Sequence, residues 1–179
     1  MWDKDNGFQN NTIEAIEKIA SERKVNRAMT NHDENTVTTD SIRSSQVAWL
    51  TDLHWIRDYL YQFVKQGNRE AFGVSVENLA DIQYTEYHAS EGDHYDWHTD
   101  VFWDQQRPWD RKLSITVQLS DSSEYDGGEF EFNECETPTD SKEKGTVLMF
   151  PSYLQHRVTP ITAGVRKSLV AWFEGPRWK

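Results

Sequence analysis

The stretch LSITVQL, residues 113–119, alternates strictly between apolar and polar side chains. Successive side chains of a strand point to opposite faces of a sheet, so this period of two predicts a strand with one buried face. Comparable short segments fill most of the chain after Gly67, and turn-forming clusters such as Asp126-Gly127-Gly128 separate them. The strands are predicted around residues 72–76, 81–88, 95–99, 113–119, 129–132, 146–150, 157–161 and 167–173.

The chain before Gly67 follows a different period. Apolar residues recur at helical spacing over residues 12–20 and again over about 51–67, which predicts two amphipathic helices. The polar stretch 21–40 between them is expected to be a surface loop. Two helices followed by about eight short strands predict a mainly β fold with N-terminal helices. We expect a double-stranded β-helix, or jelly roll, with the helices packed on one face.

Length and charge limit the classes of protein that fit. A chain of 179 residues can bury one substantial core, and 8 Trp, 7 Tyr and 8 Phe supply rings that suit a β-rich core. We expect a single domain over residues 1–179, with a helical part at about 1–66 and a jelly-roll core at about 67–179. The formal net charge of -11 would repel a phosphate backbone, so nucleic acid is not expected as a partner.

Two further features concern the cell compartment. Cys135 is the only cysteine, which excludes a disulfide within the chain and a cysteine-rich zinc site. The first residues contain neither a basic segment nor an apolar run, and no stretch approaches the roughly 18 apolar residues of a membrane span. We therefore expect a cytoplasmic protein with no signal peptide, no membrane span and no membrane partner.

The clearest chemical signal is His98-Thr99-Asp100, followed by His156 in a later β segment. A His-x-Asp pair alone is a weak signal. Side chains two apart on an extended chain point the same way, so His98 and Asp100 can reach one metal ion, with His156 as the third ligand. Two imidazoles and one carboxylate form the facial triad of non-haem Fe(II) oxygenases, which leaves adjacent positions open for other ligands. His32, His54 and His88 are interpreted as surface or structural residues. His94 has the same parity as His98 and could face the pocket, but it is not expected to bind the metal.

A candidate anion-binding residue follows the triad. Arg166 lies ten residues after His156, behind a return turn predicted at residues 162–164. By alternation Arg166 and Ser168 share one face of the next strand. A guanidinium can bind a carboxylate through two parallel hydrogen bonds, and the hydroxyl of Ser168 can add another. We predict that Arg166 anchors the far carboxylate of an oxo-acid co-substrate.

An ordered set of motifs runs from residue 42 to residue 172, most of the chain. The motifs are IRSSQVAWL at 42–50, QYTEY at 83–87, HYDWHTD at 94–100, the stretch 111–121, GGEF at 127–130, GTVLMF at 145–150 and the His156–Arg166 pair. Together they resemble the prolyl 4-hydroxylase branch of the 2-oxoglutarate/Fe(II)-dependent oxygenase superfamily, including its small bacterial and phage hydroxylases. No single motif is decisive, and the specificity lies in the order of the set.

The resemblance implies roles for the metal and co-substrate residues. His98, Asp100 and His156 match the iron ligands, and Arg166 matches the 2-oxoglutarate anchor. Collagen-type members generally use a lysine as the anchor, and Lys167 is adjacent, but only one of the two can face the metal. Arg166 is preferred because the small bacterial hydroxylases use arginine at this spacing.

The same resemblance assigns further binding and catalytic positions. Those on the co-substrate side are Tyr87, Ser168 and Gln118, the last standing where relatives often have a tyrosine. Those that hold the substrate near the iron are Tyr95 and Arg111, with Arg43, Ser45 and Trp172 in contact with the peptide. A substrate groove is expected from the aromatic residues Tyr95, Trp97, Trp103, Trp109 and Trp172, and residues 101–110 are a candidate lid.

The implied cofactors are Fe(II), 2-oxoglutarate as co-substrate and O2, with ascorbate as an optional reductant. The implied reaction hydroxylates proline in a peptide or protein, coupled to oxidative decarboxylation of 2-oxoglutarate to succinate and CO2. Two alternatives stay open. One is a 2-oxoglutarate oxygenase that acts on a small molecule or another side chain, and the other is a non-catalytic jelly-roll binding module.

Overall fold

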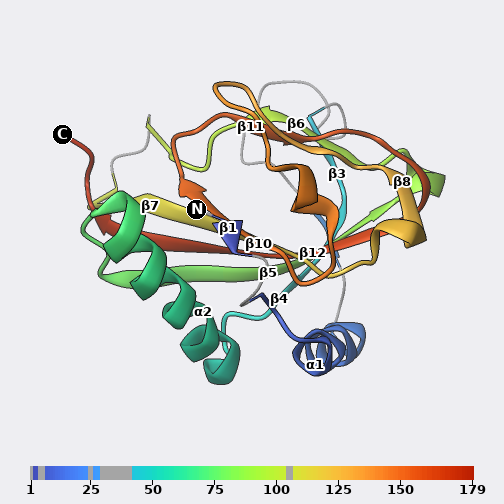
Figure 1. Ribbon diagram of the computed structural model, residues 1–179, viewed down its shortest axis with the longest axis horizontal. Coiled ribbons are helices and arrows are strands. Elements are labelled where there is room, and N and C mark those ends of the chain that lie inside the picture. Colours follow the sequence, from blue (N-terminus) through green and yellow to red (C-terminus); the bar gives the residue numbers. More distant parts are fainter. Residues whose placement is uncertain (1, 4–6, 24–25, 29–41, 104–106) are drawn as a thin grey trace.

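The computed structural model describes residues 2–3, 7–23, 26–28, 42–103 and 107–179. In this part of the chain two antiparallel sheets face each other, and two helices lie beneath the larger sheet (Figure 1). The helices are α1 (Asn10–Ser21), α2 (His54–Gly67) and the short turns η2 (Asn68–Phe72), η3 (Ala89–Glu91), η4 (Ser122–Glu124) and η5 (Thr139–Lys142). The strands are β1 (Trp2–Asp3), β2 (Asn26–Arg27), β3 (Arg43–Ser44), β4 (Gln46–Trp49), β5 (Asn78–His88), β6 (His94–His98), β7 (Trp109–Gln118), β8 (Tyr125–Gly127), β9 (Phe130–Phe132), β10 (Val147–Pro151), β11 (His156–Val158) and β12 (Ile161–Pro176).

The strand order is that of a jelly roll. The larger sheet runs β1-β10-β7-β12-β5-β4-β2, with β8 also paired to β12, and the smaller sheet runs β3-β6-β11-β9. One extended segment serves both sheets, because β3 pairs with β6 while β4, after Ser45, pairs with β5. The mainly β fold with N-terminal helices predicted from the sequence is therefore confirmed.

The alternation of residues 113–119 builds the two faces of the larger sheet. Leu113, Ile115 and Val117 are fully buried in the core cluster that also contains the buried side chains of both helices. Ser114 and Thr116 point to the opposite face, toward the smaller sheet. Each large apolar side chain buried in this way contributes about 1.5–3 kcal/mol to folding. The period of two thus separates a packed core from a face that is free to carry polar chemistry.

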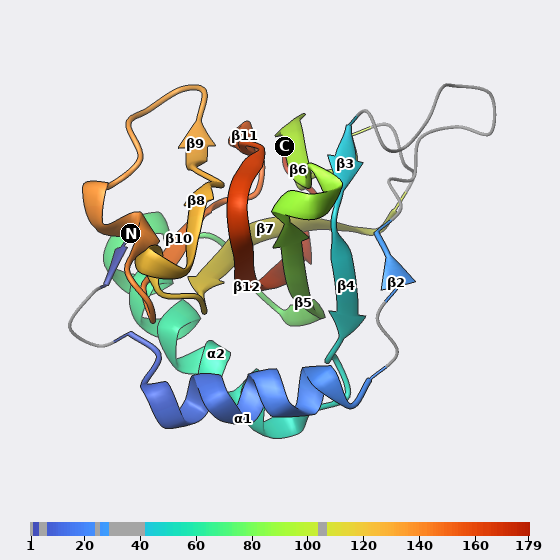
Figure 2. The same ribbon diagram turned by 90° about the vertical axis from the view of Figure 1, so that its right-hand side faces the viewer.

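The helices cover the core face of the larger sheet, as the prediction required. α1 buries Ile13, Ile16 and Ala20, and α2 buries Ile56 and Leu60 with two further residues. Figure 2 shows both helices on the same side of the sheet, away from the smaller sheet. No helix in the described residues is both long and apolar enough to cross a bilayer.

A second apolar cluster lies between the sheets. Its buried members are Tyr87, Tyr125, Phe130, Leu148, Phe150, Val158 and Ile161. Four of them, Tyr87, Phe130, Phe150 and Val158, also line the cavity of the candidate site. The smaller sheet is therefore held to the larger one by the same side chains that shape the site.

The strand predicted at residues 72–76 was wrong. α2 continues directly into the π-helical turn η2, which ends at Gly73 in the left-handed region at φ 62°. The side-chain amide of Asn68 then donates to the carbonyl oxygen of Val74 at 2.7 Å and accepts from its N–H at 2.9 Å. These two hydrogen bonds satisfy the backbone N–H and carbonyl of Val74, which would otherwise need a neighbouring strand.

The return turn predicted at residues 162–164 was also wrong. These residues belong to β12, which begins at Ile161 and pairs there with β8. Gly164 is opposite Tyr125 with φ 69°, and a Cβ at this position would come within 2.0 Å of the Glu124 carbonyl oxygen. Because glycine has no Cβ, Gly164 allows β12 to continue irregularly where the two backbones come close together. A glycine in the sequence also indicates a turn, which explains the wrong prediction.

The loop predicted at residues 21–40 is partly strand. Asn26 and Arg27 form β2 and pair with β4, and Ala28 is buried. Residues 24–25 and 29–40 lie outside the described residues, so the prediction is not tested there. The predicted segment 157–161 is divided between β11 and β12.

Candidate active site

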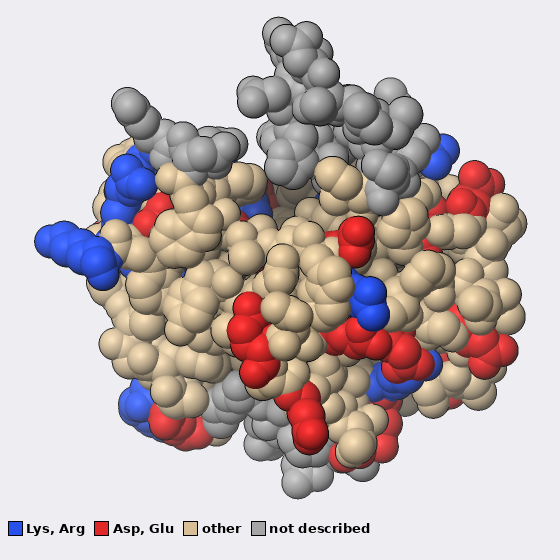
Figure 3. Space-filling view, turned by 90° about the horizontal axis from the view of Figure 1, so that it is seen from above, with Lys and Arg blue, Asp and Glu red and all other residues tan. Residues whose placement is uncertain are grey.

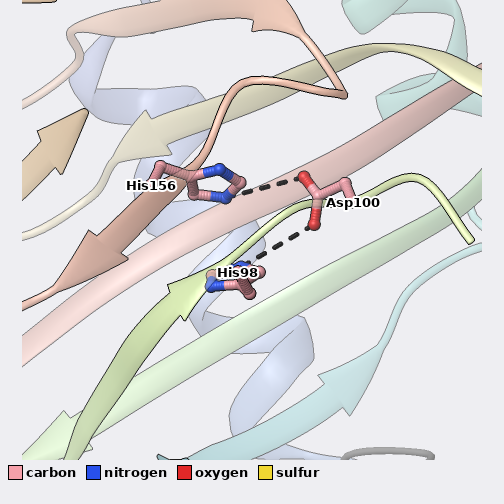
Figure 4. Close-up of side chains that lie close together, drawn as sticks. All are labelled: His98, Asp100 and His156. Carbon is pink, nitrogen blue, oxygen red and sulfur yellow. Dashed lines mark ion pairs between the residues drawn. The ribbon is translucent and has the colours of Figure 1, made fainter. Parts of the chain in front are cut away.

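His98, Asp100 and His156 come together at the ends of two paired strands. His98 is the last residue of β6, Asp100 follows in the loop, and His156 is the first residue of β11 (Figure 4). Pairing of β6 with β11 sets His98 opposite His156. One carboxylate oxygen of Asp100 lies 3.8 Å from His98 Nε2, and the other lies 3.7 Å from His156 Nε2. Among the described residues this is the one group of three potential metal ligands with all ligand atoms within 4.8 Å of one another.

Backbone carbonyls orient both imidazoles. His98 Nδ1 lies 2.8 Å from the carbonyl oxygen of Asp96, and His156 Nδ1 lies 3.0 Å from that of Leu154. A carbonyl oxygen only accepts hydrogen bonds, so both Nδ1 atoms carry the proton and donate. In the neutral ring the lone pair is then on Nε2, on the side of Asp100, and this is the tautomer that a metal ligand requires.

The electrostatics favour neutral imidazole beside an ionised carboxylate. Burial, followed by the proximity of His156, lowers the pKa of His98 to about 3. Burial alone would raise the pKa of Asp100, but the two histidines, Arg111 and a hydrogen bond from Ser114 bring it below its ordinary value. At neutral pH His98 is therefore a neutral imidazole and Asp100 an ionised carboxylate, and ligands in these states suit a divalent ion such as Fe(II).

Arg166 lines the same cavity as the triad. Its side chain is 4% exposed, and its guanidinium makes no hydrogen bond or ion pair with a described residue. The ring of Tyr87 lies 5.7 Å from the guanidinium carbon, and Ser168 lines the wall beside it. A buried cation without an anionic partner is costly, so this position suits a ligand that brings a carboxylate.

Tyr95 is packed between the metal site and a second arginine. Its ring stacks on His98 at 3.5 Å between centroids and 10° between planes, and the Arg43 guanidinium lies 4.5 Å from the centroid of the Tyr95 ring. Burial raises the pKa of Tyr95 to about 12, with the charge of Asp100 adding to the shift against the opposing effect of Arg43. The phenol therefore stays protonated at neutral pH and can donate a hydrogen bond into the cavity.

The Arg43-Ser44-Ser45 segment has a divided role. Arg43 lines the cavity, donates through Nε to Ser45 Oγ at 3.0 Å and through a terminal nitrogen to Gln83 Oε1 at 2.8 Å. Ser45 is buried behind Arg43 and does not line this cavity. Its hydroxyl is therefore placed to hold the guanidinium, whereas the family resemblance implies direct contact with a peptide.

Arg111 lies beside the cavity in an aromatic clamp. Its guanidinium carbon is 4.0 Å from the Trp172 ring centroid and 5.0 Å from that of Phe102, and a terminal nitrogen is 3.7 Å from Asp81. Strict alternation from Ser114 would turn Arg111 toward the core. The β7–β12 pairing, however, skips from Leu113–Phe173 to Arg111–Glu174, and this irregularity turns the side chain toward Trp172.

Gln118 is outside the cavity wall. Its side-chain amide donates to the Ser120 carbonyl oxygen at 3.1 Å and to the Tyr125 hydroxyl at 3.0 Å, while Oε1 is buried and accepts no hydrogen bond from the part of the chain that the structure describes. Tyr87 and Trp172 do line the cavity. The resemblance implies that Gln118 contacts the co-substrate, but Gln118 does not line the cavity that holds the triad and Arg166.

The aromatic residues of the expected groove do not all gather at the cavity. Trp97 alternates with His98 and packs against Arg157 at 4.6 Å, away from the cavity lining. Trp103 and Trp109 are exposed. Of the lid predicted over residues 101–110, residues 104–106 lie outside the described part of the chain.

Several functional candidates were missed by sequence reasoning. Gln83 holds Arg43, and Ser114 donates to Asp100 at 2.6 Å. Phe130 and Phe150 pack on His156 with ring centroids 5.3 and 4.8 Å from it. The parity of residues 113–119 put Ser114 on the polar face, but nothing local indicated that Asp100 would lie there.

Comparisons with known proteins agree with both the candidate metal site and the jelly-roll fold. The family described as the 2OG-Fe(II) oxygenase superfamily matches residues 82–174, more than half of the chain. The protein therefore belongs to the 2OG-Fe(II) oxygenase superfamily, and its triad and Arg166 fit the iron and the oxo-acid that this membership implies.

Curated relatives are similar over part of their length. A PKHD-type hydroxylase of Synechococcus sp. (strain CC9902) is 38% identical over 84 residues, 46% of this chain and 37% of that protein. Another, from Hyphomonas neptunium, is 36% identical over 89 residues, 48% of this chain and 40% of that protein. The match thus spans about two fifths of the relatives' length.

Solved structures are similar over nearly the whole chain. A viral collagen prolyl hydroxylase from Paramecium Bursaria Chlorella virus-1 has a TM-score of 0.70 at 17% identity and covers 97% of this chain and 96% of its own. A Pseudomonas putida prolyl-4-hydroxylase has a TM-score of 0.71 at 21% identity, with 98% and 92% covered. At these identities the likeness shows the fold.

Proposed function

We propose that this protein hydroxylates proline in a peptide or protein substrate, using Fe(II), O2 and 2-oxoglutarate, which becomes succinate and CO2. The observation that carries the proposal is a cavity lined by both the facial triad and Arg166, a buried arginine that has no anionic partner among the described residues. The names of the structural neighbours, prolyl hydroxylases among them, support a prolyl substrate.

The chain's own residues divide the work of binding. His98, Asp100 and His156 would hold the iron, which supplies O2 activation and oxidation of the co-substrate when bound. Arg166 would neutralise the far carboxylate of 2-oxoglutarate, and the hydroxyl of Ser168 would add a hydrogen bond beside it. Fixing the co-substrate at both ends lowers the entropy cost of reaching a reactive geometry.

The rest of the cavity favours an apolar group over water. Phe130, Phe150 and Val158 form one wall, and Trp172 and Tyr95 form another part of the lining. Flat rings pack well against a pyrrolidine ring, and a polyproline II segment loses little entropy on binding. An apolar lining also excludes water from the reacting atoms.

The surface charge argues against nucleic acid as the substrate. Seen from above, over the smaller sheet, acidic side chains are more prominent than basic ones among the described residues (Figure 3). This agrees with the net charge of -11, which repels phosphate backbones.

The test is a mass measurement on a panel of proline-containing peptides incubated with the Fe(II)-loaded protein, O2 and 2-oxoglutarate. We expect the mass of one oxygen atom on a proline residue, with an equal amount of succinate, and neither product with Asp100→Ala. Succinate formed with a free metabolite or another side chain, and with no peptide, would replace the prolyl assignment by the wider oxygenase assignment. Absence of 2-oxoglutarate turnover with every substrate would favour a non-catalytic binding module.

A further inference from the structure

Asp100 is held by two serines that are far from it in the sequence. Ser114 Oγ lies 2.6 Å from Asp100 Oδ2, and Ser114 Oγ lies 2.9 Å from Ser152 Oγ. Both serines are completely buried, and Asp100 is 6% exposed. Three segments of the chain are therefore linked through Ser114: the loop after β6, the middle of β7 and the turn after β10.

The direction of this chain of hydrogen bonds is fixed by proton counting. An ionised carboxylate only accepts, so Ser114 must donate its single hydroxyl proton to Asp100. Ser114 then has only lone pairs for Ser152, so Ser152 donates to Ser114. The backbone adds a second hold, because the N–H of Asp100 donates to the Ser152 carbonyl oxygen at 2.9 Å. Both the backbone and the side chain of Asp100 are thus tied to the same turn.

We propose that the Ser152-Ser114 relay is a positioning device that makes Asp100 a one-oxygen ligand of the metal. Each carboxylate oxygen lies near one histidine, Oδ1 at 3.8 Å from His98 Nε2 and Oδ2 at 3.7 Å from His156 Nε2, but only Oδ2 accepts a hydrogen bond, at 2.6 Å from Ser114. Oδ1 has no hydrogen bond from a described residue and keeps its lone pairs for the metal. A carboxylate free at both oxygens can bind a metal through both of them and use up an additional coordination position. The relay keeps that position available for the co-substrate or O2.

Hydrogen bonds to a metal ligand from residues that do not themselves bind the metal orient that ligand. Their removal typically lowers metal affinity by about 10–100-fold. The inference rests on the metal site, but not on the identity of the substrate or on turnover. It concerns Ser114 and Ser152, to which neither the triad motif nor the anchor motif assigns a role.

The experiment measures binding of Mn(II) alone to the full chain, without 2-oxoglutarate. Electron paramagnetic resonance of free Mn(II) gives the affinity, and water-proton relaxation gives the number of water molecules on the bound ion. We expect Ser114→Ala to weaken Mn(II) binding about 10–100-fold and to lose one coordinated water. Ser114→Thr, which restores the hydroxyl, is expected to recover the affinity to within about threefold of wild type, and Ser152→Ala to weaken it less than Ser114→Ala.

The matched control is Thr116→Val, which removes a hydroxyl on the same face of β7, two residues from Ser114. Its Mn(II) affinity and hydration should equal those of wild type. If Ser114→Ala does not fold, Ser152→Ala decides the question, because loss of the relay's outer hydrogen bond should also lower the number of water molecules on the bound ion. An unchanged water count in a folded serine-to-alanine variant overturns the proposal, as does equal loss of affinity in Thr116→Val or failure of wild type to bind Mn(II). Absence of peptide hydroxylation in a wild-type protein that binds Mn(II) would concern the proposed function instead.

Discussion

Arg166 and Lys167 are neighbours on β12 that serve opposite faces of the larger sheet. Arg166 lines the cavity between the sheets, whereas Lys167 reaches across the helix-covered face to Glu17 of α1, with Nζ 3.0 Å from Oε1. Two adjacent cations thus lie in different surroundings, because successive side chains of a strand point in opposite directions. Under the proposed function, only Arg166 can reach a co-substrate carboxylate.

We therefore expect Arg166→Ala to raise the 2-oxoglutarate concentration needed for half-maximal turnover by at least about tenfold, the scale of one lost charge-assisted hydrogen bond. Lys167→Ala serves as the control and should leave this concentration unchanged, since its ion pair with Glu17 is partly exposed. Succinate production at varied 2-oxoglutarate measures both. A large effect of Lys167→Ala with none of Arg166→Ala would transfer the anchor role to the lysine.

The triad variants His98→Ala, Asp100→Ala and His156→Ala should each abolish turnover while the protein stays folded. The ligands lie at strand ends and in the loop that follows β6, outside the packed core cluster. Metal binding and circular dichroism, measured on the same samples, separate loss of the site from loss of the fold. Activity at the wild-type level in any one variant would remove that residue from the triad.

The substrate-side residues should affect hydroxylation more than co-substrate binding. We expect Tyr95→Phe and Arg111→Ala to lower peptide hydroxylation severely and Arg43→Ala to weaken peptide binding, because misplacing a target carbon by about 1 Å can cost on the order of a hundredfold in rate. All three should retain iron binding and the slow 2-oxoglutarate decarboxylation that occurs without peptide. Parallel loss of both half-reactions would assign these residues to the iron or co-substrate shell.

The metal-free protein should lose stability as the pH falls below about 6.5, the ordinary histidine value. The pKa of His98 is about 3 in the folded state, so below 6.5 the unfolded chain binds a proton that the folded chain does not. The free energy of unfolding should therefore fall by up to about 1.4 kcal/mol per pH unit from this group between pH 6.5 and 4.5. Urea titrations at about pH 7.5, 6.5, 5.5 and 4.5 measure the free energy of unfolding above and within this range. The free energy should decrease less steeply in His98→Gln than in wild type. Equal slopes in the two proteins would contradict the lowered pKa.

A glycine beside the anchor offers a steric test. Gly128 has φ 61°, and a Cβ there would lie 2.9 Å from Arg166 Cδ and 2.3 Å from Ile161 Cδ1. Gly128→Ala should therefore displace the arginine stem and weaken 2-oxoglutarate binding, measured by calorimetry with Mn(II) in place of iron. Gly73→Ala, which also has a positive φ but no heavy atom within 4 Å of its Cβ, controls for backbone strain alone. Equal 2-oxoglutarate affinity in the two variants would show that the contact with Arg166 has no effect.

The features that depend on local periodicity could be predicted from the amino-acid sequence. Alternation in residues 113–119 and the placement of Arg166 and Ser168 on one face follow from the two-residue period of a strand, and the structure places them in this way. The His-x-Asp spacing likewise brings His98 and Asp100 to one site, because two side chains separated by one residue point in the same direction.

The contacts between distant segments, and the places where strands depart from regularity, depend on the assembled fold. Ser114 and Ser152 reach Asp100 because β7 lies beside β10 and the loop after β6 returns to them, a pairing that no local pattern encodes. Arg111 faces Trp172 because the strand pairing shifts next to Leu113, which reverses the parity that alternation predicts. A shift in register is set by the partner strand and its packing, so its consequences for side-chain direction follow from the assembled sheet.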